Sequence, residues 1–324
     1  LGGGSTIDTA KAMNLFSTHE GELLDYINKP IGAGKPVPGP LKPHIALPTT
    51  AGTGSETTPV IVLDLLDQKV KTGISHRYIR PTVAVIDPLN TLHCPPMVTA
   101  SVGCDVICHA AESFTARPYD TRPRIPDPAE RPAYIGSNPI ADLWSQQAIR
   151  WCATYLRRAT YNPLDIEARS YMLLASTFAG IGFGNAGVHI PHAMAYPVAG
   201  MVKEYWPPDY DVDEPLVPHG LSVIINAPAA FRYTAAAWPE RHAELAELLG
   251  VDTRGMPVRA AAEAAADAIQ QLMRDVGIPN GLEELGYGEA DIPGLVEGAM
   301  KQQRLLVGSP RPVDADALAG IFRD

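Results

Sequence analysis

The sequence lacks the features of a membrane protein and of a disulfide-bonded secreted protein. No apolar run approaches the ~18 to 20 residues that span a bilayer, and no basic-then-apolar leader opens the chain. The cysteines show no disulfide framework, so reduced and buried thiols are expected for Cys94, Cys104, Cys108 and Cys152. We therefore expect a soluble, cytoplasmic protein that does not act on a membrane.

The sequence also lacks an excess of positive charge. Its 26 Lys and Arg residues against 36 Asp and Glu residues give a formal net charge of -10, and the pI is near 5.4. Binding to nucleic acid or to an anionic membrane needs a basic patch, so neither is an expected partner. A negatively charged small-molecule substrate would instead need a local cluster of cations.

The composition that remains is typical of a folded globular protein. Hydrophobic residues make up 46% and charged residues 19% of the 324 positions, which predicts a substantial core and two domains. Runs of β-branched residues at 45–47, 60–63 and 83–87 alternate with helical patterns, so we predict that residues 1–96 belong to an α/β domain. From Met97 onward the spacing is helical, which predicts a second, all-α domain at 97–324.

Within the second domain the periodicity predicts helices over residues 140–156, 164–179 and 258–273. Six prolines between residues 117 and 139 exclude a helix there and predict a long ordered loop or a lid. The glycines at 180–184 predict a joint at which helices approach closely.

One candidate metal-ligand pair lies at the start of this domain. Asp105 and His109 are four residues apart on a predicted helix, so both side chains project from one face, and Glu112 shares that face. An Asp and a His at this spacing are more often an exposed helix pair, so the pair alone is weak evidence for a metal.

A cluster of histidines strengthens the metal hypothesis. His189, His192 and His219 lie close together in the sequence, near Tyr196. Imidazole and carboxylate ligands together suit Fe(II), Zn(II) or Mn(II), and the absence of paired thiolates argues against a structural zinc site. The pattern favours a catalytic ion with an open coordination position.

Two loops in the first domain are candidates for binding a nucleotide. The glycine turn at 2–5 precedes Asp8 and a helical pattern, so its backbone N–H groups and the helix N-terminus could hold a pyrophosphate. The hydroxyl-rich loop at 48–56 follows the strand at 45–47, where nucleotides bind in open α/β sheets, although its residues also suit a helix cap. A glycine turn of this kind normally follows a strand, so we expect further residues before Leu1.

Four motifs together resemble the iron-containing (group III) alcohol dehydrogenases: Gly-Gly-Gly-Ser-x-x-Asp at 2–8, Pro-Thr-Thr-Ala-Gly-Thr at 48–53, Asp-x-x-x-His at 105–109 and Pro-His-Gly at 218–220. They occur in the family's order and extend across essentially the whole chain. The resemblance implies a dehydroquinate synthase-like fold, with an α/β nucleotide-binding domain truncated at its N-terminus and an all-α metal-binding domain, and we expect a homo-oligomer.

Within the family, the segments 131–139, 182–189 and 215–222 resemble hydroxyacid-oxoacid transhydrogenases. The resemblance implies that 4-hydroxybutyrate reduces a bound nicotinamide and that 2-oxoglutarate reoxidises it. The products would be succinate semialdehyde and 2-hydroxyglutarate. A general iron-containing NAD(P)-dependent alcohol dehydrogenase is the alternative.

The family's metal ligands can be transferred to this sequence residue by residue. Relatives carry a second histidine four positions after the third ligand, and Tyr196 stands there in this chain. Tyr196 or His189 is therefore expected to replace that histidine in proton transfer. The implied ligands of the catalytic ion, Fe(II) or Zn(II), are Asp105, His109, His192 and His219.

The family's cofactor contacts are transferred in the same way. NAD(H), tightly bound in a transhydrogenase, is the implied cofactor, and NADP(H) stays open because the strands that distinguish the two would precede Leu1. The implied contacts are Gly3, Gly4, Ser5 and Asp8 at the phosphates, Thr49, Thr50 and Thr53 near the nicotinamide, and Lys71 at the ribose.

The anionic substrates of a transhydrogenase would need cations. Four arginines of the proline-rich stretch are candidates, with a solvated lid surface as the alternative for each: Arg117, Arg122, Arg124 and Arg131. Two further hypotheses are a metal hydrolase whose ion activates water, which leaves both N-terminal loops unexplained, and a non-catalytic fragment with an incomplete nucleotide site.

Overall fold

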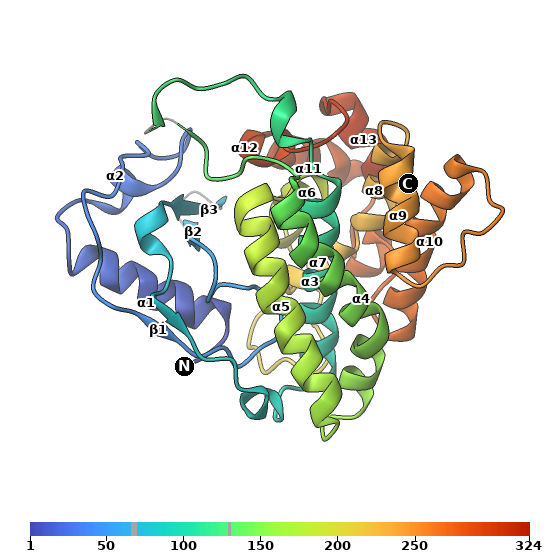
Figure 1. Ribbon diagram of the computed structural model, residues 1–324, viewed down its shortest axis with the longest axis horizontal. Helices are drawn as coiled ribbons and strands as arrows, with labels where there is room; N and C mark the ends of the chain where they lie inside the picture. Colours follow the sequence, from blue (N-terminus) through green and yellow to red (C-terminus); the bar gives the residue numbers. More distant parts are fainter. Residues whose placement is uncertain (66–69, 129–130) are drawn as a thin grey trace.

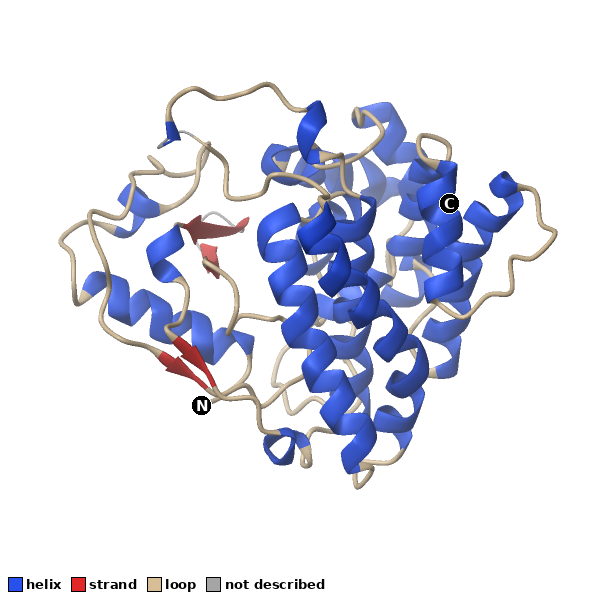
Figure 2. Cartoon of the chain, viewed as in Figure 1, coloured by secondary structure: helices blue, strands red, loops and turns tan. Residues whose placement is uncertain are grey.

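The computed structural model describes residues 1–65, 70–128 and 131–324. The described strands all belong to the N-terminal part of the chain, which lies on one side of a large helical body (Figure 1). Figure 2 shows the same division, with the strands in red confined to that side. The expected α/β part followed by a helical part is confirmed.

The N-terminal part is built on two pairs of strands and the helix α1 (Gly4–Phe16). β1 (Ile45–Ala46) pairs in parallel with β4 (Val83–Ala84), as expected for an α/β unit. β2 (Val60–Leu65) pairs with β3 (Val70–Ser75) in an antiparallel hairpin whose second strand the sequence pattern did not predict.

A small core of its own holds this part together. Helix α1 packs against β2, and the short helix α2 (Leu23–Tyr26) contributes an aromatic ring to the same cluster. Burial of apolar side chains at about 25 cal/mol per Å² is the main stabilising contribution of such a cluster. Its buried members are Leu15, Tyr26, Ile27, Val37, Ile61, Ile74 and Ile79.

The helical part surrounds α3 (Pro96–Thr115), which begins with proline in its first turn and is buried along most of its length. Helices α4, α5 and α7 pack against α3. The other helices complete the body: α4 (Pro139–Tyr161), α5 (Ile166–Ala186), α6 (Ile190–Gly200), α7 (His219–Ile224), α8 (Ala227–Ala235), α9 (Pro239–Leu248), α10 (Val258–Asp275), α11 (Ile292–Met300), α12 (Gln303–Leu306) and α13 (Ala315–Arg323).

The predicted helices at 140–156, 164–179 and 258–273 are confirmed as parts of α4, α5 and α10. No single helix in the described ranges is long and apolar enough to cross a bilayer. Helices α5 and α6 reach that length and composition only as a pair, bent by 106°.

The glycines at 180–184 do not form the predicted joint, because they lie inside α5. The close approach that they predict is present: a Cβ on Gly180 would lie 2.1 Å from Thr57 Oγ1, and one on Gly182 would lie 2.4 Å from Ser145 Oγ. The break between helices comes later, at Gly187, whose φ of 96° favours glycine. Tertiary contact therefore outweighs the low helix propensity of glycine here.

The described residues of the proline-rich segment, 117–128 and 131–138, contain no α-helix, as predicted. A short 3-10 turn (Tyr119–Thr121) lies near the start of the segment, and a bridge between Pro118 and Ser137 brings its two ends together. Its far end is tied to the end of α5, where the N–H groups of Ile135 and Gly136 donate to backbone carbonyls. Both ends of the segment are thus fixed to the helical body.

Candidate metal and cofactor site

The first two residues of the site come from one face of α3. Asp105, His109 and Glu112 follow the predicted helical spacing, and all three side chains are buried. His109 Nε2 lies 3.8 Å from Asp105 Oδ1. The ring of Phe183 stacks on His109 at a centroid distance of 4.1 Å and fixes its plane.

Helix α6 places a third side chain opposite that face. His192 Nε2 lies 3.5 Å from Asp105 Oδ1, and the rings of His192 and His109 are 4.6 Å apart. The other nitrogen of His192, Nδ1, is 2.5 Å from Glu112 Oε1. A hydrogen bond of this kind fixes the tautomer and the orientation of a ligating imidazole.

His219, the first residue of α7, completes the group. The next residue explains the motif Pro-His-Gly, because a Cβ on Gly220 would lie only 2.1 Å from the carbonyl oxygen of Ser101 in α3. Only glycine allows α7 to begin this close to α3. The rings of His219 and His192 are 5.6 Å apart as a result.

The donor atoms of this group suit a metal ion. Ligand atoms of Asp105, His192 and His219 all lie within 4.8 Å of one another. Each of the four side chains has one buried polar atom with no hydrogen-bond partner among the described residues, which is costly unless a further group binds it. These atoms are Asp105 Oδ1, His109 Nδ1, His192 Nε2 and His219 Nδ1.

Charge within the group is strongly coupled. Burial lowers the pKa of His109 and of His219 to about 4, so both rings are neutral and can ligate. Burial also opposes ionisation of Asp105, but the imidazoles around it outweigh that effect and hold the pKa of the carboxyl well below its usual range. Among these rings His192 carries the charge, because Glu112 and Asp105 outweigh its burial and raise its pKa to about 10, so a bound ion would take the place of its Nε2 proton. The arrangement presents one carboxylate among imidazole rings, the ligand set of a borderline divalent ion.

His189 lies behind this group and not beside the pocket. Its Nδ1 accepts from the N–H of Ile190 at 2.8 Å, so the proton is on Nε2, which is 3.1 Å from Thr115 Oγ1. The backbone N–H of His189 donates to the Glu112 carboxylate at 2.6 Å. With both ring nitrogens engaged and the residue fully buried, His189 orients Glu112 and has no open path to a substrate.

A pocket of about 200 Å³ opens onto the cluster. A larger one, about 470 Å³, lies near the C-terminus and contains none of the predicted site residues, so we place the chemistry in the smaller pocket. The predicted residues that line the smaller pocket are Gly4, Ser5, Asp8, Thr53, Lys71, Asp105, His109, His192, Tyr196 and His219.

The structure brings the two predicted cofactor loops together. The N–H of Gly2 donates to the Leu47 carbonyl, and the N–H of Thr49 donates to the Gly2 carbonyl, both at 3.1 Å. A Cβ on Gly4 would lie 2.5 Å from Thr53 Cγ2, so glycine is needed where the loops meet. Three predicted contacts lie behind this junction and do not line the pocket: Gly3, Thr49 and Thr50.

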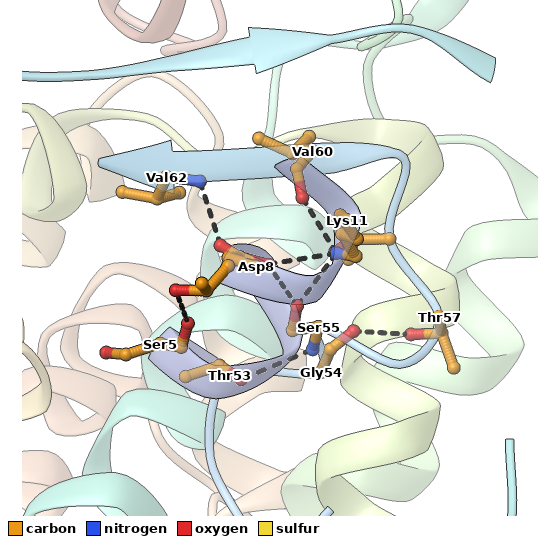
Figure 3. Close-up of polar contacts among 11 residues, drawn as sticks. Ser5, Asp8, Lys11, Thr53, Gly54, Ser55, Thr57, Val60 and Val62 are labelled. Atoms are coloured by element: carbon orange, nitrogen blue, oxygen red, sulfur yellow. Dashed lines mark hydrogen bonds and ion pairs between the residues drawn. The ribbon is translucent and has the colours of Figure 1, made fainter. Parts of the chain in front are cut away.

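The carboxylate of Asp8, predicted to contact the cofactor phosphates, is bound by groups of the protein itself (Figure 3). Its carboxylate accepts from the N–H of Val62 at 2.8 Å and from the Ser55 hydroxyl, and pairs with Lys11 Nζ at 3.0 Å. Lys11 is fully buried and also donates to the Val60 carbonyl at 2.7 Å. This network ties α1 to the second loop and to β2.

None of the four arginines predicted to meet the substrate lines the pocket. Arg117 donates to Thr121, Arg122 to the Tyr134 carbonyl and Arg131 to the Ile125 carbonyl, while Arg124 is exposed. The structure instead adds three residues that the sequence interpretation did not assign to the site: Glu112 behind the cluster, and Tyr134 and Arg304 in the pocket wall.

Several curated proteins similar to this chain are named hydroxyacid-oxoacid transhydrogenases. The chain is 55% identical over 324 residues to the mitochondrial hydroxyacid-oxoacid transhydrogenase of Bos taurus, covering 99% of this chain and 70% of that protein. It is 54% identical to the human protein of the same name, covering 99% and 69%.

These names contradict the expected cytoplasmic location. The similar transhydrogenases from cattle, human, rat and mouse are all named mitochondrial. The expectation was wrong because composition, which is all that it rested on, does not distinguish the compartments in which a globular enzyme works.

Solved structures and family models agree with these relatives. A 1,3-propanediol oxidoreductase matches with a TM-score of 0.85 and 34% identity over 99% of this chain and 75% of that one. Sulfoacetaldehyde reductase from Bifidobacterium kashiwanohense, solved with NAD+, matches with a TM-score of 0.79 and 29% identity over 100% and 74%. The model of iron-containing alcohol dehydrogenase matches residues 1–88, and that of the family's C-terminal part matches residues 130–324. The chain therefore belongs to the iron-containing alcohol dehydrogenase family of oxidoreductases.

Proposed function

We propose that this protein is a hydroxyacid-oxoacid transhydrogenase that moves hydride between a hydroxy acid and an oxo acid through a nicotinamide. The observation that carries the proposal is the pocket in which four metal-ligand side chains face the glycine turn and the threonine loop. The identity of 55% to a transhydrogenase over almost the whole chain supports this choice within the family.

The metal would be held by Asp105, His192 and His219, whose ligand atoms lie within 4.8 Å of one another, with His109 beside them as the fourth ligand. Fe(II) is the ion that the family name suggests, and Zn(II) accepts the same ligands. When bound, the ion supplies a Lewis acid that polarises the substrate oxygen.

The nicotinamide cofactor would lie between the two N-terminal loops and the metal ligands. The N-terminus of α1 offers the free N–H groups of Gly4 and Ser5 to the diphosphate, with Gly3 as the preceding cap. Thr53 and Lys71 line the same pocket nearer the strands. NAD(H) is favoured because the reductase from Bifidobacterium kashiwanohense was solved with NAD+.

The two predicted domains would bind different parts of the reacting system. We propose that residues 1–96 are the remaining part of the nucleotide-binding domain and that residues 97–324 bind the metal and the substrate. The N-terminal part has a hydrophobic cluster of its own, which supports this boundary, while Ala51 and Ile86 pack with the cluster of the helical part.

Tyr196 is the pocket group that would exchange a proton with the substrate. It occupies the position of the family's second histidine, and its ring lies 6.4 Å from that of His219. Its hydroxyl accepts a hydrogen bond from Arg304 at 3.1 Å, which leaves its own proton free to be donated. His189 lacks this access because its ring nitrogens are engaged elsewhere.

A hydride-exchange assay without added NAD tests the proposal. The metal-loaded enzyme is given 4-hydroxybutyrate with 2-oxoglutarate, and succinate semialdehyde and 2-hydroxyglutarate are expected in equal amounts. Turnover of simple alcohols with NAD, and none of the acid pair, would instead identify a general alcohol dehydrogenase. Metal-dependent ester hydrolysis without nicotinamide binding would identify a hydrolase.

His219→Ala tests the metal site within this function. Metal content by elemental analysis and exchange activity are expected to fall together, because a ligand is removed while the helix remains. Full activity without metal would contradict the assignment.

A further inference from the structure

Arg304, in the short helix α12, is a cation of the pocket wall that has no anionic partner. Its guanidinium donates to the Tyr196 hydroxyl at 3.1 Å, and the hydroxyl of Tyr134 also faces it. No carboxylate among the described residues forms an ion pair with it. A half-buried guanidinium is normally paired, so an unpaired one that faces a ligand pocket indicates an anionic ligand.

The other cation of the pocket is already neutralised. Lys71 pairs with Asp64 at 2.8 Å, and both residues lie on the hairpin of the N-terminal part. The arginines of the proline-rich segment bind their own segment or remain exposed. In a protein with a net charge of -10, Arg304 is therefore the residue available to an anionic substrate beside the metal ligands.

The wall around Arg304 is assembled from three separate parts of the chain. The proline-rich segment contributes Tyr134, which is held by Arg122 through its carbonyl at 2.9 Å. Tyr134 packs so closely on Gly187 that a Cβ there would lie 2.8 Å from it. Helix α6 contributes Tyr196, and α12 contributes Arg304 itself.

We propose that Arg304, together with the hydroxyl of Tyr134, binds the carboxylate of the substrate and selects acids over alcohols. The proposal rests on the proposed function for its substrate class. A guanidinium offers a planar pair of N–H donors that matches a carboxylate, and a phenol hydroxyl can donate to an outer oxygen. The Tyr196 hydroxyl, which accepts from Arg304, keeps its own proton for the reacting oxygen.

One anchor of this kind serves both half-reactions. In 4-hydroxybutyrate the carbon that loses hydride is separated from the carboxylate carbon by two methylenes. In 2-oxoglutarate the carbon that gains hydride is separated by two methylenes from the distal carboxylate carbon. Both substrates therefore place the reacting carbon at the metal ligands while the same arginine binds the carboxylate. Acids with one methylene fewer or more should be poorer substrates.

Arg304→Gln is the test, with binding and kinetics measured separately. Glutarate has the same spacing between its carboxylates as 2-oxoglutarate but no oxo group to reduce. It is titrated into the metal- and nicotinamide-loaded enzyme by calorimetry. We expect glutarate affinity to fall about 10- to 100-fold in Arg304→Gln and less in Arg304→Lys, which keeps the charge without the planar pair. Arg124→Gln, the same change at an exposed arginine outside the pocket, should bind glutarate as the original protein does.

The kinetic comparison uses 4-hydroxybutyrate and 1-butanol, which differ by the carboxylate. The substitution should raise the KM for the acid and lower kcat/KM much more for the acid than for the alcohol with NAD, because any effect that acts through Tyr196 is common to both substrates. Equal glutarate affinity in Arg304→Gln and the original protein, or no glutarate binding by either, would overturn the proposal. If the original protein exchanges no hydride between acids while Arg304→Gln still loses glutarate affinity, the transhydrogenase function fails and the carboxylate site stands.

Discussion

His192 and Glu112 are joined at 2.5 Å between an imidazole nitrogen and a carboxylate oxygen, on the side of His192 that faces away from Asp105. The second oxygen of Glu112 accepts from the N–H of His189, the residue that caps α6. One carboxylate thus fixes both the ring of a metal ligand and the start of the helix that carries it.

Glu112→Gln should weaken metal retention about 10- to 100-fold, the usual effect of removing the partner of a ligating histidine. The amide keeps the shape but loses the charge that orients His192. The measurement is metal content after dialysis against graded chelator, with Fe(II) under anaerobic conditions and with Zn(II). Glu297→Gln, which removes only an exposed ion pair with Lys301, is the control. Equal retention in both variants would show that Glu112 does not support the metal.

Lys71→Ala should weaken NAD(H) binding about 10-fold, the magnitude of one charge-assisted hydrogen bond. The side chain lies in the pocket, is 21% exposed and pairs with Asp64. Fluorescence titration with NADH measures the affinity. Lys203→Ala removes a comparable lysine–aspartate pair outside the pocket and should leave affinity unchanged. An equal affinity in Lys71→Ala would remove this residue from the cofactor site.

Glu56→Gln should become increasingly stabilising, relative to the original protein, as pH rises. Glu56 is 3% exposed and accepts from Thr177 at 2.9 Å, and burial raises the pKa of its carboxyl above the usual value. As pH rises, the Glu56 carboxyl therefore ionises first in the unfolded chain. The original protein loses stability between the pKa of Glu56 in the unfolded chain and its higher pKa in the folded protein. The non-titrating amide does not incur this loss.

Urea unfolding at several pH values from 4 upward checks the Glu56 prediction, with the exposed Glu283→Gln as the control for general charge effects. A difference in unfolding free energy between Glu56→Gln and the original protein that stays constant with pH would show that burial does not penalise this carboxylate.

Gly180→Ala should lower the free energy of unfolding by about 1–3 kcal/mol through overpacking. Its new methyl group would meet Thr57 at 2.1 Å and the backbone of Gly54. Gly320→Ala, also inside a helix but with nothing within 4 Å of the added Cβ, should gain about 0.5–1 kcal/mol. Denaturant unfolding of the two variants gives the comparison, and a stabilised Gly180→Ala would mean that α5 does not approach the loop this closely.

Local patterns in the sequence predicted the features that depend on local spacing. The i, i+4 relation of Asp105 and His109 follows from helix geometry, and the alanine-rich α10 follows from propensity. Strand β3 was missed because Lys71, Thr72 and Gly73 give it little apolar character, and pairing with β2 forms it. The glycines of α5 were misread because their contacts with distant residues outweigh their local preference.

The substrate side of the pocket was not predictable from local patterns. Arg304 stands 108 positions after Tyr196, in a helix of four residues, and no motif marks it. The arginines at 117–131 were better candidates by clustering, yet Arg117, Arg122 and Arg131 hydrogen-bond to their own segment and Arg124 is exposed. Which cation faces the ligand is decided by tertiary packing alone.

The proline-rich segment supplies Tyr134 to the pocket while supplying none of the metal ligands. Surface segments accept substitutions and insertions more readily than the helices that they cover. Selection can therefore alter which acids or alcohols such an enzyme accepts by remodelling a surface segment, while the inherited ion and nicotinamide sites persist unchanged. Related enzymes would then diverge in substrate specificity before they diverge in the reaction that they catalyse.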